Sequence, residues 1–349
     1  MPKILSSERS HEYVIIFLMK VSKLGEFGLI DLLAKMIEKA RVDRFAADRP
    51  LIGIGDDAAV WRPDGALELA TVDTLFEGVH FNQETTPWRD LGWKSLAINL
   101  SDIAAMGGVP EYALVALALP EDIAVADVTA LYDGIIEIAK ETHTAIVGGN
   151  ITRAPQVSVT ITVIGRSLNS DILRRDAARP GDVIAVTGNP GSAAGGFEML
   201  TEGLKFKSEA YEYLKNAFLR PVPRLMEGQT LIKLGVKAAI DISDGLLSDL
   251  RHICEESKVS ARIFAERLPI HPLLKGSFGD KAQGLALSGG EDYELLFTAS
   301  AAAVNKAKTE LKCPVSALGE ITAGEPGKIE FIDAQGKIVK TGKTGWRHF

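Results

Sequence analysis

The segment RPGDVIAVTG at residues 179–188 decides how the chain is divided. Pro180 and Gly181 are a turn signal, and the apolar run after Asp182 is typical of a buried strand. Helix and strand patterns alternate on both sides of this turn. Because 349 residues suit two domains of ordinary size better than one, the segment predicts a boundary between two α+β units.

The two units share one kind of pattern, in which short apolar runs alternate with stretches of helical apolar spacing. In the first unit we predict helices at 25–47, 87–106 and 124–142, and strands at 51–54, 58–62, 67–75, 112–120, 145–149 and 157–165. In the second unit we predict helices at 192–204, 207–218, 223–234, 244–257 and 301–311, and strands at 182–188, 237–243, 261–266, 285–290, 293–300, 314–319 and 328–333. The prediction is an α/β (α+β) fold with an N-terminal extension at 1–24, an N-terminal domain at 25–166 and a C-terminal domain at 167–349.

Composition and charge exclude several classes of protein. The formal net charge of −7 argues against a broad nucleic-acid surface, which needs clustered Lys and Arg. The apolar run YVIIFL at 13–18 is too short to span a membrane. Cys254 and Cys313 have no metal-binding spacing and suit a reducing compartment. We therefore expect a cytoplasmic protein without a nucleic-acid or membrane partner.

Acidic residues recur at predicted strand ends, turns and helix ends, among small or apolar neighbours. They are Asp56, Asp57, Asp73, Asp102, Asp241, Asp244, Glu291 and Asp292. A buried carboxylate without a partner is costly, and few Lys or Arg lie nearby in the sequence. Asp244 could cap the helix that follows it, and Asp241 could be a turn residue. Their recurrence favours several magnesium ions, which take hard oxygen ligands.

Glycine clusters follow several strand-like runs and could place backbone N–H groups against phosphate oxygens. They are GGNITR at 148–153, TGNPGSAAGG at 187–196 and LSGGEDYE at 287–294. The second could equally be ordinary helix–strand packing, and it does not match the GxGxxG pattern of dinucleotide folds.

A few further side chains could serve a phosphate or a ligand ring. Arg153, Arg174 and Arg175 could pair with phosphate, although at least one of Arg174 and Arg175 is expected to be a solvated surface residue. His80 is expected to be a packed polar residue, and Trp346 either fills a core or stacks on a ligand.

Taken in order, the motifs resemble those of the thiamine-monophosphate kinase family, from about Gly25 to the C-terminus. The motifs are GEFGLI, GIGDDAAV, TVDTLFEGVHF, NLSDIAAMGG, GGNITR, RPGD, AIDISDGLLSDL and LSGGEDYELLFT. Aminoimidazole ribonucleotide synthetase, selenophosphate synthetase and a hydrogenase maturation factor belong to the wider superfamily and share its ATP-binding architecture. VDTLFEGVHF together with IDISDGL and SGGEDYEL resembles the kinase branch.

The resemblance implies transfer of the γ-phosphoryl group of ATP, the co-substrate, to thiamine monophosphate. It implies an N-terminal mixed sheet with helices that binds ATP and Mg²⁺ and pairs in a homodimer, followed by a C-terminal α/β domain. The implied magnesium ligands are Asp57, Thr71, Asp73, Asp102, Asn150, Asp241 and Asp244. Gly149, Asn150, Arg175 and Ser243 would contact ATP, and His80, Glu291 and Trp346 would line the thiamine phosphate pocket.

One position departs from the family pattern, and one pair of neighbouring aspartates has to be divided between two roles. The family often has GGDTTR where this chain has GGNITR, so that Asn150 replaces an aspartate and one metal is expected to bind more weakly or to be held mainly by ATP. Asp56 and Asp57 are neighbours in an extended segment, where successive side chains point to opposite faces. Asp57 is therefore the expected metal ligand, and Asp56 is expected to brace the turn after Gly55.

The acceptor in this reaction is a phosphate oxygen that is already anionic, so no general base is expected. Catalysis should rest on charge neutralisation and in-line positioning, without a phosphorylated protein intermediate. Three alternatives stay open at this point. They are another ATP-dependent enzyme of the superfamily that activates a carboxamide or formyl oxygen, a non-catalytic nucleotide-binding regulatory module, and a metal-dependent phosphatase.

Overall fold

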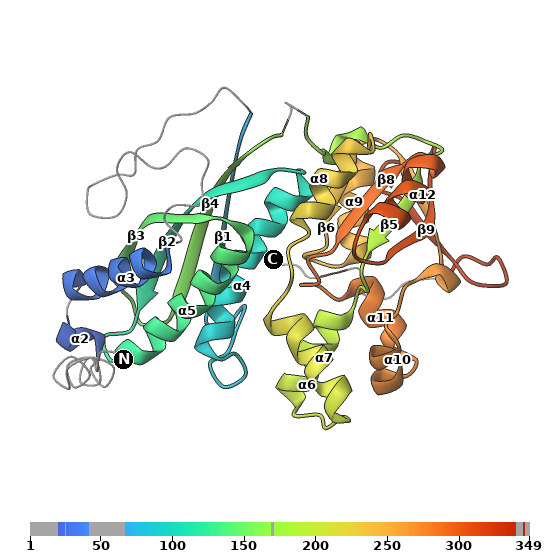
Figure 1. Ribbon diagram of the computed structural model, residues 1–349. Helices are drawn as coiled ribbons and strands as arrows, with labels where there is room; N and C mark the ends of the chain where they lie inside the picture. The colour runs from blue at the N-terminus through green and yellow to red at the C-terminus, as the bar shows by residue number, and fades with distance from the viewer. Residues whose placement is uncertain (1–19, 25, 42–66, 169–170, 340–344, 346–349) are drawn as a thin grey trace, which may run out of the picture. The chain divides into compact units, whose positions relative to one another are not determined.

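The computed structural model describes residues 20–24, 26–41, 67–168, 171–339 and 345 (Figure 1). Residue contacts divide the chain into two compact units. The first comprises Met1–Gly65, Ala70–Asn99 and Pro110–Ile164, and the second comprises Ala66–Leu69, Leu100–Val109 and Gly165–Phe349. Each unit has its own sheet and its own helices, which confirms the predicted two-domain α/β class.

The first unit is built on a four-stranded sheet in the order β1-β4-β2-β3. Its strands are β1 (Glu68–Phe76), β2 (Val109–Leu119), β3 (Ala145–Arg153) and β4 (Ser158–Arg166), and its helices are α2 (Val21–Leu24), α3 (Glu26–Ala40), α4 (Trp88–Ala105) and α5 (Val125–Thr142). Residues in β4 alternate strictly between buried and half-buried, as expected for a strand with one face on a core. The last residues of α4, from Leu100 onward, belong to the second unit.

Helices α4 and α5 approach each other closely at two glycines. A Cβ atom added at Gly92 would lie 1.8 Å from the carbonyl oxygen of Leu131, and one added at Gly134 would lie 1.8 Å from that of Arg89. Glycine inside a helix costs about 1 kcal/mol relative to alanine. The close packing of the two helices is the physical reason for glycine at both positions.

The second unit is built on a six-stranded sheet in the order β10-β7-β9-β5-β8-β6. Its strands are β5 (Val183–Thr187), β6 (Ala238–Asp241), β7 (Ser260–Phe264), β8 (Leu295–Ala299), β9 (Val315–Thr322) and β10 (Ile329–Ile332). Its helices are α6 (Ser192–Glu202), α7 (Ser208–Leu219), α8 (Leu225–Lys233), α9 (Leu246–Glu256), α10 (Pro272–Phe278), α11 (Lys281–Ser288) and α12 (Ala301–Glu310), with 3-10 turns η2 (Arg175–Ala177) and η3 (Ala265–Arg267).

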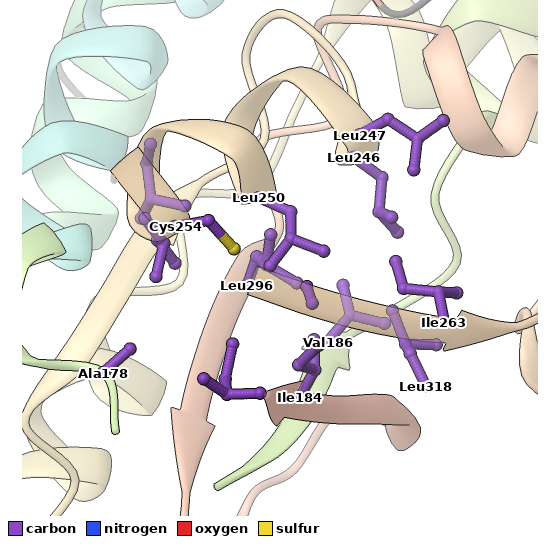
Figure 2. Packing of buried hydrophobic residues seen from close by; sticks show 14 of the residues in the cluster. Ala178, Ile184, Val186, Leu246, Leu247, Leu250, Cys254, Ile263, Leu296 and Leu318 are labelled. Atoms are coloured by element: carbon purple, nitrogen blue, oxygen red, sulfur yellow. The ribbon is translucent and has the colours of Figure 1, made fainter. Parts of the chain in front are cut away.

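An apolar core lies between α9 and this sheet (Figure 2). Helix α9 contributes Leu246, Leu250 and Cys254, which recur at a spacing of four and therefore share one helix face. The strands contribute Ile184, Val186, Ile263, Leu296 and Leu318, all of them fully buried. This packing holds α9 against the sheet, so the start of α9 has a defined position after β6.

The strand register brings three loops to one end of this sheet. β8 runs antiparallel to both β5 and β6, with Val186 opposite Leu296 and Asp241 opposite Leu295. The ends of β5 and β6 and the beginning of β8 therefore lie at the same edge. The loops that leave β5 and β6 and the loop that enters β8 must meet there.

Most predicted elements are confirmed within a few residues, but one prediction in the second unit is wrong. LALSGG at 285–290 was expected among the strands, whereas residues 285–288 end helix α11. KAQGLALS is rich in Lys, Ala, Gln and Leu, which favour helix, and short apolar runs do not separate the two states. Helix α10, which no pattern predicted, begins at Pro272 with the His271 ring accepting the N–H of Leu273.

Other predictions concern parts of the chain that the structure does not describe. The predicted strands at 51–54 and 58–62 lie outside the described residues, and so does the part of the predicted first helix beyond Arg41. In the portion that is described, none of the helices combines the length and the apolar character that a bilayer crossing requires.

Candidate functional site

Acidic residues gather where β6 ends in the second unit. Asp241 is the last residue of the strand and is only 3% exposed. Its Oδ2 accepts a hydrogen bond of 2.8 Å from the hydroxyl of Ser101, which is buried as well. Ser101 and the half-buried Asp102 belong to the end of α4 that is part of this unit. The hydroxyl of Ser101 thus orients the Asp241 carboxylate.

Asp249 is a member of this acidic group that the sequence patterns did not single out. It lies in the first turns of α9, is 2% exposed, and accepts the backbone N–H groups of Asp244 (3.2 Å) and Gly245 (3.1 Å) on Oδ2. Its position could have been found, because Asp249 falls three residues after Leu246 on the buried face of α9. A buried carboxylate on an apolar helix face needs hydrogen-bond donors or a cation beside it, because burying an unpaired charge is costly.

The same contacts decide between two interpretations of Asp244. Gly245 precedes α9 and, as a glycine, has no side chain that could cap the helix. The side chain of Asp249 accepts the N–H groups of Asp244 and Gly245, the two residues before the helix. The interpretation of Asp244 as a helix-capping residue is therefore not what the structure shows. The side chain of Asp244 is left half-buried at the turn.

The donor set at this turn suits a divalent cation. Oxygen or nitrogen atoms of Asp244, Asp249 and His252 lie within 4.8 Å of one another. Burial raises the pKa of Asp249 to about 8, and the charges of Asp241 and Asp244 act in the same direction. Carboxylates that repel one another in this way are relieved by a bound cation, and oxygen-rich sites of this kind suit Mg²⁺.

The loop before β8 lies directly against this turn. The N–H of Glu291 donates to the carbonyl of Ser243 at 2.8 Å, and the N–H of Tyr293 donates to the carbonyl of Ile242 at 2.8 Å. The N–H of Ile242 in turn donates to the backbone carbonyl of Glu294 at 2.8 Å. The structure therefore brings together Ser243, predicted to contact ATP, and Glu291, predicted to contact the acceptor.

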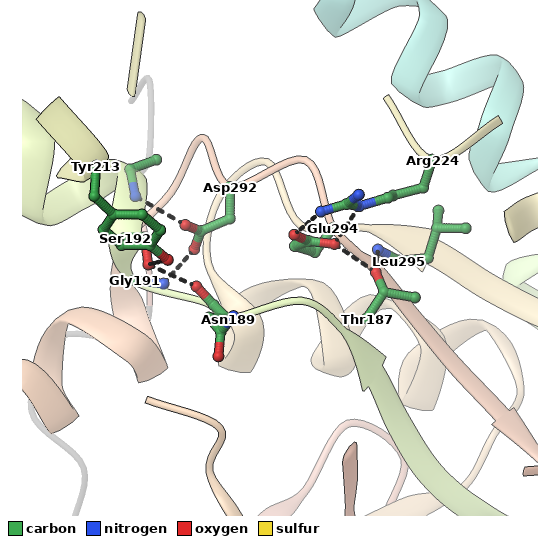
Figure 3. A network of polar contacts seen from close by, with 10 residues as sticks. Thr187, Asn189, Gly191, Ser192, Tyr213, Arg224, Asp292, Glu294 and Leu295 are labelled. Atoms are coloured by element: carbon green, nitrogen blue, oxygen red, sulfur yellow. Dashed lines mark hydrogen bonds and ion pairs between the residues drawn. The ribbon is translucent and has the colours of Figure 1, made fainter. Parts of the chain in front are cut away.

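Beneath this loop is a network of buried polar contacts (Figure 3). The guanidinium of Arg224 donates to both carboxylate oxygens of Glu294 at 2.7 and 2.5 Å, and the hydroxyl of Thr187 donates to Glu294 at 2.6 Å. Burial opposes the charge on Arg224, but the hydrogen bonds and charge of Glu294 prevail and raise its pKa. The network anchors the start of β8.

The glycine cluster at 187–196 does not offer its N–H groups to a ligand in the way that its composition suggested. The N–H groups of Gly191 and Ala193 donate to the carboxylate of Asp292, at 2.6 and 3.1 Å. Burial raises the pKa of Asp292 to about 8, while these two N–H groups favour its charged form. For this cluster the packing interpretation is therefore the better one, with an acid of the chain at the helix start.

In the first unit, Thr71 and Asp73 lie two residues apart on β1 and so share one face of the strand. The N–H of Asp73 donates to Oδ1 of Asn99 at 3.0 Å, and Asn99 is completely buried. The amide of Asn99 also donates to the carbonyl of Ser95 at 3.0 Å. Asn99, which the sequence patterns did not single out, therefore fixes the backbone that carries Asp73.

Three further predicted residues belong to the same unit. Gly149 and Asn150 are exposed on β3, where they pair with Val115 and Ala116 of β2. His80 follows β1, and its Nδ1 accepts the N–H of Phe76 at 3.0 Å. That bond leaves Nε2 as the protonated nitrogen of a neutral ring. His80 is half-buried, in keeping with the expected packed polar role.

The predicted arginines lie in different surroundings. Arg153 is exposed and pairs with Glu121 at 3.1 Å, and Arg174 is exposed and pairs with Asp176. Arg174 thus fits the expected surface role. Arg175 opens η2, beside the beginning of β6 and the end of α9. The acids lie at the opposite ends of both elements, and no ion pair among the described residues joins Arg175 to them.

Three predicted residues lie outside the described residues. They are Asp56, Asp57 and Trp346. Their assignments stay predictions, as do the roles of the described candidates in binding metal, ATP or acceptor.

Two family models match the chain. The N-terminal domain of AIR synthase related proteins matches residues 55–167. The C-terminal domain of the same family matches residues 179–332. Together these ranges take in both units, including β6, α9 and the loop before β8.

Individual relatives match over nearly the whole chain. The thiamine-monophosphate kinase of Bacillus subtilis (strain 168) is 36% identical over 338 residues, which are 93% of this chain and 100% of the relative. The crystal structure of thiamine-monophosphate kinase from Stenotrophomonas maltophilia K279a has a TM-score of 0.79 and 38% identity, and covers 88% of this chain and 96% of its own. A structure described as AaThiL complexed with AMPPCP and TMP has a TM-score of 0.73 and 32% identity, and covers 95% of this chain and 100% of its own.

Proposed function

This chain belongs to the thiamine-monophosphate kinase family of AIR synthase related proteins, and from that premise we propose that it phosphorylates thiamine monophosphate to thiamine diphosphate with ATP. One observation carries the proposal. The end of β6 and the turn after it, which carry Asp241 and Asp244, and the loop before β8, which carries Glu291, are joined by backbone hydrogen bonds. A relative bound to AMPPCP and TMP supports the choice of substrates.

We propose that the reaction uses several Mg²⁺ ions, and that the acids at the end of β6 in the second unit are among their ligands. The proposed ligands are Thr71, Asp73 and Asn150 in the first unit and Asp102, Asp241 and Asp244 in the second, together with Asp57, which lies outside the described residues. When bound, magnesium neutralises the charge of phosphate oxygens. Ligand atoms of Asp244, Asp249 and His252 within 4.8 Å of one another support a cation at this turn, as does the pKa of Asp249, which burial and then the charges of Asp241 and Asp244 raise.

The residues of the chain itself position the reacting groups. Ser101 orients the Asp241 carboxylate, and Asp249 holds the backbone that carries Asp244. A phosphate acceptor is already anionic, so no side chain has to remove a proton from it. We therefore propose direct in-line transfer, in which repulsion between the two anionic substrates is the main obstacle.

A steady-state assay with ATP, Mg²⁺ and thiamine monophosphate tests the proposal. We expect ADP and thiamine diphosphate in equal amounts, with ADP formation dependent on the acceptor. ADP release with a carboxamide or formyl substrate instead would identify another superfamily activity. Phosphate release without ATP would identify a phosphatase, and ATP binding without turnover a regulatory module. A phosphorylated chain trapped in a single turnover would contradict direct transfer.

Replacing Asn150 with aspartate is expected to lower the Mg²⁺ concentration that gives half-maximal rate by about 10-fold, the lower end of the effect of changing a group that orients metal ligands. Asn150 is exposed on β3 and offers only an uncharged oxygen, so a carboxylate there adds charge to the predicted site. The measurement is a Mg²⁺ titration at saturating ATP, with Glu84→Gln as an exposed control of the same unit. An unchanged titration would show that position 150 does not contact the metal.

We also propose that the chain forms a homodimer through its first unit. β1 lies at the edge of the four-stranded sheet, and its outward residues include Val72 (59% exposed) and Phe76 (38% exposed). Exposed apolar residues on one face of an edge strand are typical of a surface that another chain covers. We propose in addition that residues 25–166 form the domain that binds ATP and Mg²⁺ and dimerises, and that residues 167–349 form the C-terminal α/β domain.

Replacing Val72 with glutamate is expected to convert the dimer to a monomer, because a charge would be buried at the centre of the proposed interface. Light scattering coupled to size exclusion measures the mass. Val222→Glu is a matched control, since Val222 is 56% exposed on the second unit. A wild-type monomer, or a Val72→Glu protein that stays dimeric, would contradict the proposed interface.

A cytoplasmic location completes the proposal. Both cysteines, Cys254 and Cys313, are free, and burial raises the pKa of each thiol, to about 12 and about 11. Unpaired, unreactive thiols suit a reducing compartment. Fractionation of cells that express the chain would test this location.

A further inference from the structure

The loop Gly289–Glu294 connects α11 to β8 and carries Glu291, whose predicted role is to contact the acceptor. Its backbone is unusual, because Glu291 (φ 67°) and Tyr293 (φ 51°) both adopt the left-handed conformation. Residues with a Cβ atom disfavour that region, and they keep it only where the surroundings hold them there. The loop must therefore be restrained by specific contacts.

Two kinds of contact restrain this loop. On one side, the N–H groups of Glu291 and Tyr293 donate to the carbonyls of Ser243 and Ile242, both at 2.8 Å. On the other side, the residue between them, Asp292, reaches away to the start of α6 (Figure 3). Asp292 is thus the side chain that ties the middle of the loop to a different element.

Each carboxylate oxygen of Asp292 accepts one backbone N–H group at the start of α6. Oδ2 accepts the N–H of Gly191 at 2.6 Å, and Oδ1 accepts the N–H of Ala193 at 3.1 Å. The first N–H groups of a helix lack partners within the helix, and they favour a negative group. Gly191 precedes α6 and offers no side-chain cap of its own. Asp292 therefore supplies the cap from 99 to 101 residues away along the chain.

We propose that Asp292 is a positioning residue for the acceptor: its carboxylate binds the start of α6 and thereby keeps Glu291 in the left-handed conformation that presents it to thiamine monophosphate. The proposal rests on the proposed function, because it assigns the acceptor to Glu291. Asp292 itself contacts no substrate. Its removal should loosen the loop at its centre while the ends of the loop stay attached.

Glu294 and Arg224 hold a different part of this region. Glu294 is 8% exposed and is bonded to Arg224 and Thr187, next to the first residue of β8. This pair belongs to the core of the second unit, so its loss should affect folding. Asp292 is two residues before Glu294 and lies in the irregular part of the loop, where its loss should affect geometry.

The test is the variant Asp292→Ala, studied by steady-state kinetics and thermal unfolding. We expect KM for thiamine monophosphate to rise about 10- to 100-fold, as for the loss of other orienting side chains, while KM for ATP changes less than about twofold. Asp292→Asn keeps one acceptor oxygen and should show a smaller rise. The start of α6 should also exchange its amide hydrogens faster in the alanine variant.

A matched control is Asp182→Ala. Asp182 also accepts a backbone N–H, that of Arg179 at 2.9 Å, but it precedes β5 at the other end of the sheet. We expect Asp182→Ala to lower the melting temperature without changing either KM.

Each outcome bears on a different claim. If wild type turns over thiamine monophosphate but Asp292→Ala leaves its KM unchanged, the positioning role is wrong and the proposed function stands. If both KM values rise together with a loss of stability, the role is structural and the inference is wrong. If wild type shows no turnover of thiamine monophosphate, the proposed function fails and the inference fails with it.

Discussion

Replacing Asp244 with alanine is expected to lower kcat by about 10²- to 10³-fold, the scale seen when one electrostatic contact to the reacting group is lost. The fold should survive the change. It is the backbone N–H of Asp244, and not its side chain, that donates to Asp249 and holds the turn. The half-buried carboxylate is therefore free for a metal, and its removal leaves the turn attached.

The measurement is kcat in the acceptor-dependent assay, together with the melting temperature. Asp102→Ala, at the end of α4, should behave in the same way, because Asp102 is half-buried and belongs to the same predicted ligand set. Asp280→Ala is the control, since Asp280 is exposed and caps no helix with its side chain. Rates near wild type at saturating Mg²⁺ would contradict the assignment of Asp244 as a metal ligand.

Replacing Arg224 with methionine is expected to destabilise the second unit by about 3–5 kcal/mol, because Glu294 would be left as an uncompensated buried charge. The Arg224 side chain is 20% exposed and that of Glu294 is 10% exposed, so water cannot replace the lost partner well. For a unit of this size, a loss of that magnitude lowers the melting temperature by roughly 10 °C. Thermal unfolding followed by circular dichroism measures it.

Two further variants show whether the effect comes from the buried charge. Arg224→Met combined with Glu294→Met should be less destabilised than Arg224→Met alone, because the charge without a partner is gone. Lys237→Met is the control. Its ion pair with Asp171 has a similar distance, 3.0 Å, but both side chains are 56% exposed, and such a pair contributes less than about 1 kcal/mol. Equal losses in both single variants would contradict the importance of burial.

Local patterns in the sequence predicted most of the fold. The alternation in β4 and the helical spacing in α9 are each contained in one segment, and each tells which face is buried. The wrong strand at 285–290 has a local cause too. A run of Leu and Ala followed by Ser and Gly is compatible with either state, and the preceding residues, which complete α11, decide for helix.

The sequence also predicted only part of the candidate site. The recurrence of acids among small residues predicted that a cation is needed, and Asp241 is indeed buried with a hydroxyl partner. Asp249 was missed because its character depends on the face of α9 on which it lies. Asp292 was grouped with the metal-facing acids, yet the structure places its carboxylate on the N–H groups of Gly191 and Ala193.

The sequence by itself determined the family, the two α/β units and the residue types that could hold a cation and a phosphate. The units and the residue types follow from composition and spacing, which act over a few residues, whereas the family follows from the resemblance of the motifs. Only the tertiary structure showed which groups each acid contacts. Ser101 meets Asp241 across 140 residues and Thr187 meets Glu294 across 107. The second pair exists because β5 and β8 are neighbours in one sheet, and the first because the end of α4 belongs to the same unit as β6. Both neighbourhoods are settled by packing between segments that are distant in the chain.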